Sequence, residues 1–171
     1  EGGMLVINDD RFKNRAEIIW EKGTNRTAFY RGEVDKYGWV DVGSSFLPSD
    51  LIAAYLVGQL ENLEKITRRR LELWNMYHLE FADLETKGRV KRPRLPKYGS
   101  NNGHVYYLQC ESLSQRSALI DHLKRHEIGA VFHYLSLHRS PFYHDKHDER
   151  ELPNADRFAN TIVRLPLHLH L

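Results

Sequence analysis

The sequence predicts an α/β chain of the α+β type, in which a small sheet carries helices on one side and follows a long connecting helix. Three observations support this class. An apolar pattern with helical spacing runs from Pro48 to Phe81, short apolar runs follow it, and helical segments separate those runs. The later elements are a strand over 105–110, a helix from Ser112 or Ser114 to about Gly129, a strand over 130–135, a helix over 154–162 and a final strand.

The segment before the long helix is predicted to be mixed. Residues 4–7 form a short apolar run that is typical of a buried strand. Residues 8–10 offer helix N-caps, a helix with its apolar face follows over 12–20, and Gly23 is a plausible end. Apolar residues show neither helical nor strand periodicity over 24–45, which predicts a long loop. The aromatic residues in this stretch argue against disorder.

The long helix is predicted to begin at Pro48, where the missing N–H of proline is tolerated. Its apolar stripe is interrupted at Thr67 and the arginines 68–70. The pattern therefore allows one very long helix or two helices end to end. The three arginines wrap around the helix, so a solvated surface is favoured over a phosphate contact.

Composition narrows the class of protein. The chain has 171 residues, of which 41% are hydrophobic and 28% charged, as in soluble globular proteins. A net charge of +2 is too small to indicate nucleic-acid binding by itself. Cys110 is the single cysteine, which excludes an internal disulfide and fits a reducing cytoplasm. We find no signal peptide and no apolar run of membrane-spanning length.

Both ends of the chain are apolar, which is uncommon for natural termini. A strand-like run begins almost at once, and residues 165–171 are still alternating and apolar at the last position. We therefore expect an internal part of a longer protein.

A glycine and several hydroxyls, residues 43–50, lead into the long helix. The free N–H groups and the dipole at a helix N-terminus attract phosphate or carboxylate groups. Capping of the helix by Ser49 or a neighbouring residue explains the same residues without a ligand. Spacing alone leaves both interpretations open.

The loop after the strand 130–135 is rich in histidine. His144 and His147 are accompanied by Asp145, Asp148 and Glu149, but the spacing matches no zinc pattern and predicts a solvated loop. His133 and Tyr134 end the strand, so their side chains point to opposite faces. One of them is expected to pack, while the other faces a cleft.

Several stretches together resemble one family. They are EKGTNR at 21–26, RGEVDKY at 31–37, WVDVGSSFL at 39–47, SDL at 49–51, RSALI at 116–120, AVFHY at 130–134, LH at 137–138 and RLPL at 164–167. The chain resembles the DegT-type sugar aminotransferases over nearly its whole length. Within them it is similar to the branch of dTDP-4-amino-4,6-dideoxygalactose transaminases of surface-polysaccharide synthesis.

This resemblance implies a C-terminal part of a fold type I, pyridoxal-phosphate-dependent aminotransferase that works as a homodimer in the cytoplasm. Residues 1–47 would be the tail of the large cofactor-binding domain, and residues 48–171 the small domain without its last helix. The Schiff-base lysine would lie upstream of Glu1, so this part has no catalytic residue and is expected to be inactive alone. The enzyme would transfer an amino group from an amino acid, usually glutamate, to a nucleotide-linked 4-keto-6-deoxy sugar.

The resemblance also assigns site residues. Ser45, with Ser44, would contact the cofactor phosphate of the partner subunit, whereas Tyr134 and His138 would line the sugar-nucleotide side. Most of the family has GYNYR where this chain has GSSFL at 43–47, a difference shared by the dideoxygalactose branch. No metal, nucleic-acid or membrane site is expected. The alternatives are a small α/β module that binds a metabolite or protein without catalysis, and a metal-dependent hydrolase that uses the loop from His144 to His147.

Overall fold

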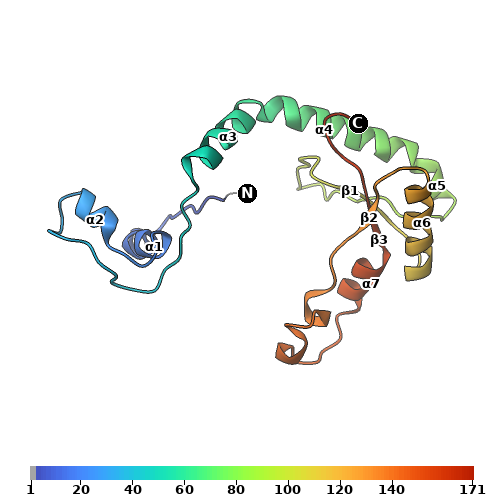
Figure 1. Ribbon diagram of the computed structural model, residues 1–171. Coiled ribbons are helices and arrows are strands. Elements are labelled where there is room, and N and C mark those ends of the chain that lie inside the picture. The colour runs from blue at the N-terminus through green and yellow to red at the C-terminus, as the bar shows by residue number, and fades with distance from the viewer. Residues whose placement is uncertain (1–2) are drawn as a thin grey trace. The chain divides into compact units, whose positions relative to one another are not determined.

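The computed structural model describes residues 3–171 and divides the chain into two compact units, Glu1–Glu61 and Asn62–Leu171 (Figure 1). The division falls later than the domain boundary expected after residue 47, and it places the first part of the long helical region in the first unit. The domain boundary itself stays a prediction.

The first unit begins with an extended segment. Residues 4–7 are not a strand, because among residues 3–171 no other segment pairs with them, and Met4 and Leu5 are exposed. A strand needs a neighbour to satisfy its N–H and C=O groups, so an apolar run alone did not suffice. The expected helix is present as η1 (Asp10–Phe12) and α1 (Lys13–Trp20), and the Asp9 carboxylate caps it.

A short helix, α2 (Arg26–Tyr30), interrupts the segment predicted to be a continuous loop. The buried Glu21 carboxylate anchors this helix. It accepts a hydrogen bond from Arg26 Nη1 at 3.1 Å and another from Thr27 Oγ1 at 3.4 Å. Arg26 also donates to the Tyr30 hydroxyl. The remainder of the loop returns to the residues just before this helix, where an isolated bridge joins Trp39 to Thr24.

Two glycines allow the end of α1 and the segment 41–46 to approach each other closely. Gly23 has a φ of +79°, and a Cβ there would overlap the carbonyl oxygen of Asp41. A Cβ on Gly43 would overlap the amide nitrogen of Gly23 and lie 2.8 Å from the carbonyl oxygen of Ile19. Only residues without a side chain fit at this crossing.

The long helical region consists of two successive helices, α3 (Asp50–Glu61) and α4 (Leu63–Glu80), separated at Asn62. The break precedes the interrupted stripe at 67–70, and α3 begins two residues after Pro48, at Asp50. Several large apolar side chains of the first unit are exposed, namely Phe12, Trp20, Leu56 and Leu60. Among residues 3–171 no helix is both long enough and apolar enough to cross a membrane.

The second unit is built on three strands: β1 (Tyr106–Gln109), β2 (Val131–Phe132) and β3 (Ile162–Leu165). Their order is β1-β3-β2, and β3 is antiparallel to both neighbours (Figure 1). The two outer strands are therefore parallel to each other, and α6 (Leu113–Arg125), capped by Ser112, connects them. β2 is shorter than the expected strand 130–135 because only two of its residues pair with β3.

One face of this sheet forms the core. Tyr106 pairs with Leu165 and Leu108 with Val163, so these four side chains share a face, and all are buried. Residues of α4 and α6 pack against the same cluster, which confirms a small sheet with helices on one side. They are Trp74, Tyr77, Leu119, Ile120 and Leu123. Tyr106 is fully buried, its hydroxyl finds no partner among residues 3–171, and burial raises its pKa to about 12.

The connections of this unit follow the surface. After α4 come α5 (Ala82–Thr86) and an irregular segment that α4 holds in place, since Arg70 Nε donates to the Gly103 carbonyl at 2.9 Å. The histidine-rich loop after β2 contains two 3₁₀ turns, η2 (Leu137–Arg139) and η3 (His144–Lys146). It leads into α7 (Pro153–Thr161), close to the expected helix 154–162, which packs beside α6.

The glycine crossing predicts a large effect of one methyl group. We expect Gly43→Ala to lower the free energy of unfolding of the first unit by about 1–3 kcal/mol, because the added Cβ has no space. Gly38→Ala is the matched control, since no atom lies within 4 Å of its Cβ position. Hydrogen exchange of the Ser44 amide, which donates to Ile19, reports the loss directly. Equal protection in the two variants would contradict the crossing.

Candidate functional site

Ser44 and Ser45 lie on a segment that is fixed to the end of α1. Lys22 N–H donates to the Ser44 carbonyl at 3.0 Å, Ser44 N–H donates to the Ile19 carbonyl at 3.0 Å, and an isolated bridge joins Glu21 to Ser45. The backbone of both serines is thereby held by α1, next to the glycine crossing.

The hydroxyl groups of these serines face outward. Both residues are exposed, and among residues 3–171 neither hydroxyl has a hydrogen-bond partner. Hydroxyl groups on a fixed backbone are suitable donors for a phosphate. The residues present therefore fit the phosphate of pyridoxal phosphate by their chemistry.

The helix N-terminus does not contribute as expected. α3 begins at Asp50, beyond Ser45, and its first turn carries the acidic side chain of Asp50 itself. Ser49 Oγ accepts from Ile52 N–H at 3.3 Å, so helix capping explains Ser49. The case for an anion at Ser45 consequently depends on its hydroxyl group and not on the dipole of α3.

Tyr134 follows β2 and is open to solvent, with 74% of its surface exposed. Its ring lies beside Arg164 of β3, whose guanidinium carbon is 5.8 Å from the ring centre. Arg164 Nε also donates to the Phe132 carbonyl at 3.3 Å. An arginine on the neighbouring strand thus fixes the end of β2 and supports the aromatic ring.

His138 lies in η2 and is packed, with 9% of its side chain exposed. Its Nε2 atom lies 3.2 Å from Asp156 Oδ1 but is out of line for a hydrogen bond. The ring of His147 lies 5.1 Å away, centre to centre. The expected pair therefore divides into an exposed Tyr134 and a His138 that is held inside its loop.

No pattern in the sequence indicated that Arg164 and Asp156 are neighbours of Tyr134 and His138. In the sequence, Arg164 belongs to the closing RLPL stretch, and Asp156 lies in the predicted helix 154–162. Both contacts join parts of the chain that are far apart in sequence, which spacing along one element does not reveal.

The histidine-rich loop forms no metal site. His144 Nδ1 lies 3.0 Å from its neighbour Asp145, and His147 Nε2 lies 2.9 Å from the Arg150 carbonyl. Within residues 3–171 no group of three or more His, Cys, Asp or Glu side chains could hold a metal ion. Nothing in this part of the chain supports a metal-dependent hydrolase.

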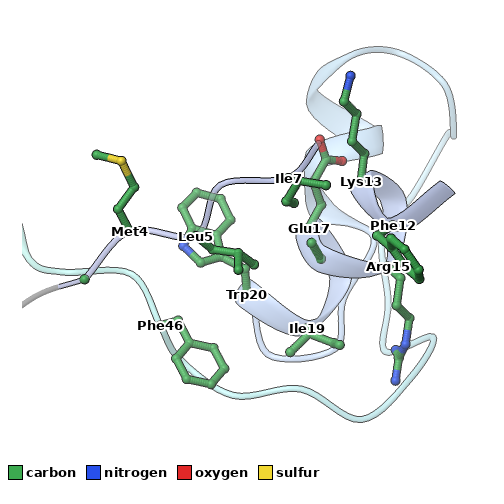
Figure 2. Close-up of a pocket in the computed structure, with 12 residues that line it drawn as sticks. Met4, Leu5, Ile7, Phe12, Lys13, Arg15, Glu17, Ile19, Trp20 and Phe46 are labelled. Atoms are coloured by element: carbon green, nitrogen blue, oxygen red, sulfur yellow. The ribbon is translucent and has the colours of Figure 1, made fainter. Parts of the chain in front are cut away.

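A cavity of about 780 Å³ opens within the first unit. Figure 2 shows its lining from three parts of the chain: the N-terminal segment with Met4, Leu5 and Ile7, α1 with Ile19 and Trp20, and Phe46 directly after Ser45. Lys13, Arg15 and Glu17 provide its polar atoms. The lining is mainly apolar and includes neither Ser44 nor Ser45.

Comparison with known proteins gives a consistent result. Two curated relatives are each 27% identical to this chain over 98% of its length: MJ1066 from Methanocaldococcus jannaschii and the spore coat polysaccharide biosynthesis protein SpsC from Bacillus subtilis. This chain spans 45% of either relative, which is less than half of their length.

Solved aminotransferases share the fold. DesV from S. venezuelae superposes with a TM-score of 0.80 at 25% identity, covering 97% of this chain and 41% of DesV. TlmJ from Streptoalloteichus hindustanus gives 0.78 at 25% identity, covering 96% of this chain and 42% of TlmJ. The PLP-form of Spr1654 from Streptococcus pneumoniae gives 0.78 at 22% identity, with 96% and 40% covered.

These similarities confirm the expected fold class and the expected family. The model of the DegT/DnrJ/EryC1/StrS aminotransferase family matches residues 1–171, and the chain therefore belongs to that family.

Proposed function

We propose that this chain is the C-terminal part of a pyridoxal-phosphate-dependent sugar aminotransferase. The family match over the full chain is the observation that carries the proposal. The chain spans less than half of its relatives, which is consistent with our proposal that the lysine and the residues that would hold the cofactor ring belong to the remainder of the protein. This chain then supplies walls of the active site, and by itself it is inactive.

The proposed reaction moves an amino group from an amino acid, with glutamate as the donor, to a nucleotide-linked 4-keto-6-deoxy sugar. The dideoxygalactose-type GSSFL stretch at 43–47 favours a dTDP-linked sugar of surface-polysaccharide synthesis, including lipopolysaccharide. SpsC, by its name a polysaccharide biosynthesis protein, supports this general direction. Nucleotide sugars and glutamate are intracellular metabolites, so we place the reaction in the cytoplasm.

Ser45 and Ser44 are the proposed cofactor contacts. Pyridoxal phosphate, when bound, carries the amino group and provides the electron sink for the reaction. The serine pair would donate hydrogen bonds to its phosphate from across a homodimer interface. The exposed hydroxyl groups and the backbone anchored to α1 support this role.

Tyr134 and His138 are the proposed substrate contacts. Tyr134 offers an exposed aromatic face and a hydroxyl group beside a guanidinium group, which suits a nucleotide-linked sugar. His138 is packed beside Asp156, so its proposed part is to hold the loop that lines the substrate side. The loop position itself is typical of ligand contacts.

The proposal predicts different behaviour for the whole protein and for this chain. With glutamate and a dTDP-linked 4-keto-6-deoxy sugar, the whole protein should produce the aminated sugar. This chain, mixed with pyridoxal phosphate and borohydride, should show no stoichiometric label on any one lysine. Mass spectrometry measures both. A defined, fully labelled lysine in this chain would contradict the assignment, and an inactive whole protein that still binds a metabolite would favour a binding module.

The proposed Ser45 contact predicts a result in mixed dimers. Ser45→Ala should weaken cofactor binding by about tenfold to a hundredfold, the worth of one hydrogen bond to a charged group. When a Ser45→Ala subunit is paired with a subunit that lacks the cofactor lysine, the one remaining lysine site faces an intact Ser45 and should bind normally. Cofactor titration by absorbance measures this.

Ser49→Ala is the matched control, because Ser49 caps α3 and its loss should cost about 1 kcal/mol of stability without changing cofactor affinity. A weakened site in the mixed dimer would show that Ser45 acts within its own subunit, and the contact across the interface would be wrong.

A further inference from the structure

The loop between β2 and α7 buries little apolar surface of its own. Leu135, Leu137 and Phe142 are exposed, so apolar burial contributes little there. Its regular structure consists of the two 3₁₀ turns η2 and η3. A loop of this length needs a specific anchor if Tyr134 and His138 are to keep one position.

Asp156 in the first turn of α7 provides that anchor. Its Oδ2 atom accepts from Arg139 Nε at 3.2 Å and from Arg139 Nη2 at 3.1 Å, while Oδ1 lies 3.2 Å from His138 Nε2. A hydrogen bond from the Ser136 hydroxyl, together with those from Arg139, holds the pKa of the Asp156 carboxyl below its usual range. One carboxylate thus binds Arg139 through two hydrogen bonds and lies beside His138.

The turn that Asp156 holds is closed on itself. Arg139 N–H donates to the Ser136 carbonyl at 2.9 Å, and the Ser140 hydroxyl donates to the Leu137 carbonyl at 2.7 Å. On its other side the His138 ring meets the His147 ring. These contacts hold the turn together, and Arg139 attaches it to α7.

Tyr134 is fixed from the opposite end of the same loop. Arg164 binds the Phe132 carbonyl and supports the Tyr134 ring, so the short stretch after Tyr134 is held between β3 and α7. Loosening the α7 end therefore frees the part of the segment that follows Tyr134.

We propose that Asp156 is a positioning residue of the substrate site: its carboxylate fixes the turn 136–139 and thereby the loop that presents Tyr134 and His138. This inference rests on the proposed function, because it assigns the purpose of the anchor to sugar binding. Asp156 itself does not touch the substrate.

The test uses the whole protein with Asp156→Asn, which keeps the shape and removes the charge, and with Asp156→Glu as the conservative rescue. Asp145→Asn is the matched control, since Asp145 is an exposed carboxylate in the same loop whose contact is the adjacent His144. Hydrogen exchange of residues 136–140 measures the anchor, and steady-state kinetics with each substrate measures its consequence.

We expect Asp156→Asn to speed exchange of residues 136–140 by about tenfold or more, the value of hydrogen bonds to a charged group. Asp156→Asn should raise KM for the keto sugar by a similar factor, with little change in KM for the amino donor. Asp156→Glu should partly restore the slow exchange and the low KM for the keto sugar. Asp145→Asn should change neither the exchange nor this KM. Unchanged exchange in Asp156→Asn, or faster exchange with an unchanged KM for the keto sugar, would overturn the proposal.

The two proposals fail separately. A wild-type protein that does not aminate the keto sugar refutes the proposed function by itself. In that case the exchange measurement still decides whether Asp156 holds the turn, and equal exchange in wild type and Asp156→Asn refutes the anchor.

Discussion

The second unit depends on the pairing of β3 with both of its neighbours. β3 is the last strand in the sequence, yet it occupies the centre of the sheet, so β1 and β2 acquire their common strand partner when the chain has returned through α7. The same pairing brings Tyr106 and Leu108 beside Val163 and Leu165, which creates the apolar face that α4 and α6 cover. It also sets Arg164 next to Val131, from where it reaches the Phe132 carbonyl and the Tyr134 ring. Both the core and the candidate substrate site therefore depend on the position of β3.

The first unit relies on a different constraint, the close approach of two backbone segments at Gly23 and Gly43. This crossing explains why the stretch 21–47 is so distinctive in sequence although it forms little regular structure. Glycines at the crossing, the buried Glu21 and the α2 helix all serve to hold one irregular segment against α1. Ser44 and Ser45 follow directly from that support and are exposed, as the proposed cofactor contact requires.

Much of this architecture could be predicted from the sequence. The helices α1, α4, α6 and α7 follow from periodic apolar positions and from caps such as Asp9 and Ser112. The strand over 4–7 was wrong because pairing needs a second segment, and α2 was missed because five residues carry no period. For the site, the sequence led to Tyr134 and His138 by family resemblance and chain position. It could not reveal that Arg164 supports one and Asp156 holds the other, since both contacts arise from the order of strands and from the return of α7.

The central claim is that the loop after β2 belongs to the sugar-binding side of an aminotransferase. The most direct measurement compares Michaelis constants of the whole enzyme for its two substrates in Tyr134→Phe and His138→Ala variants. If the loop lies on that side, both variants should raise KM for the nucleotide-linked keto sugar more than KM for the amino donor. Small and equal effects on both constants would contradict it, and would show that Tyr134 and His138 serve only to pack their loop.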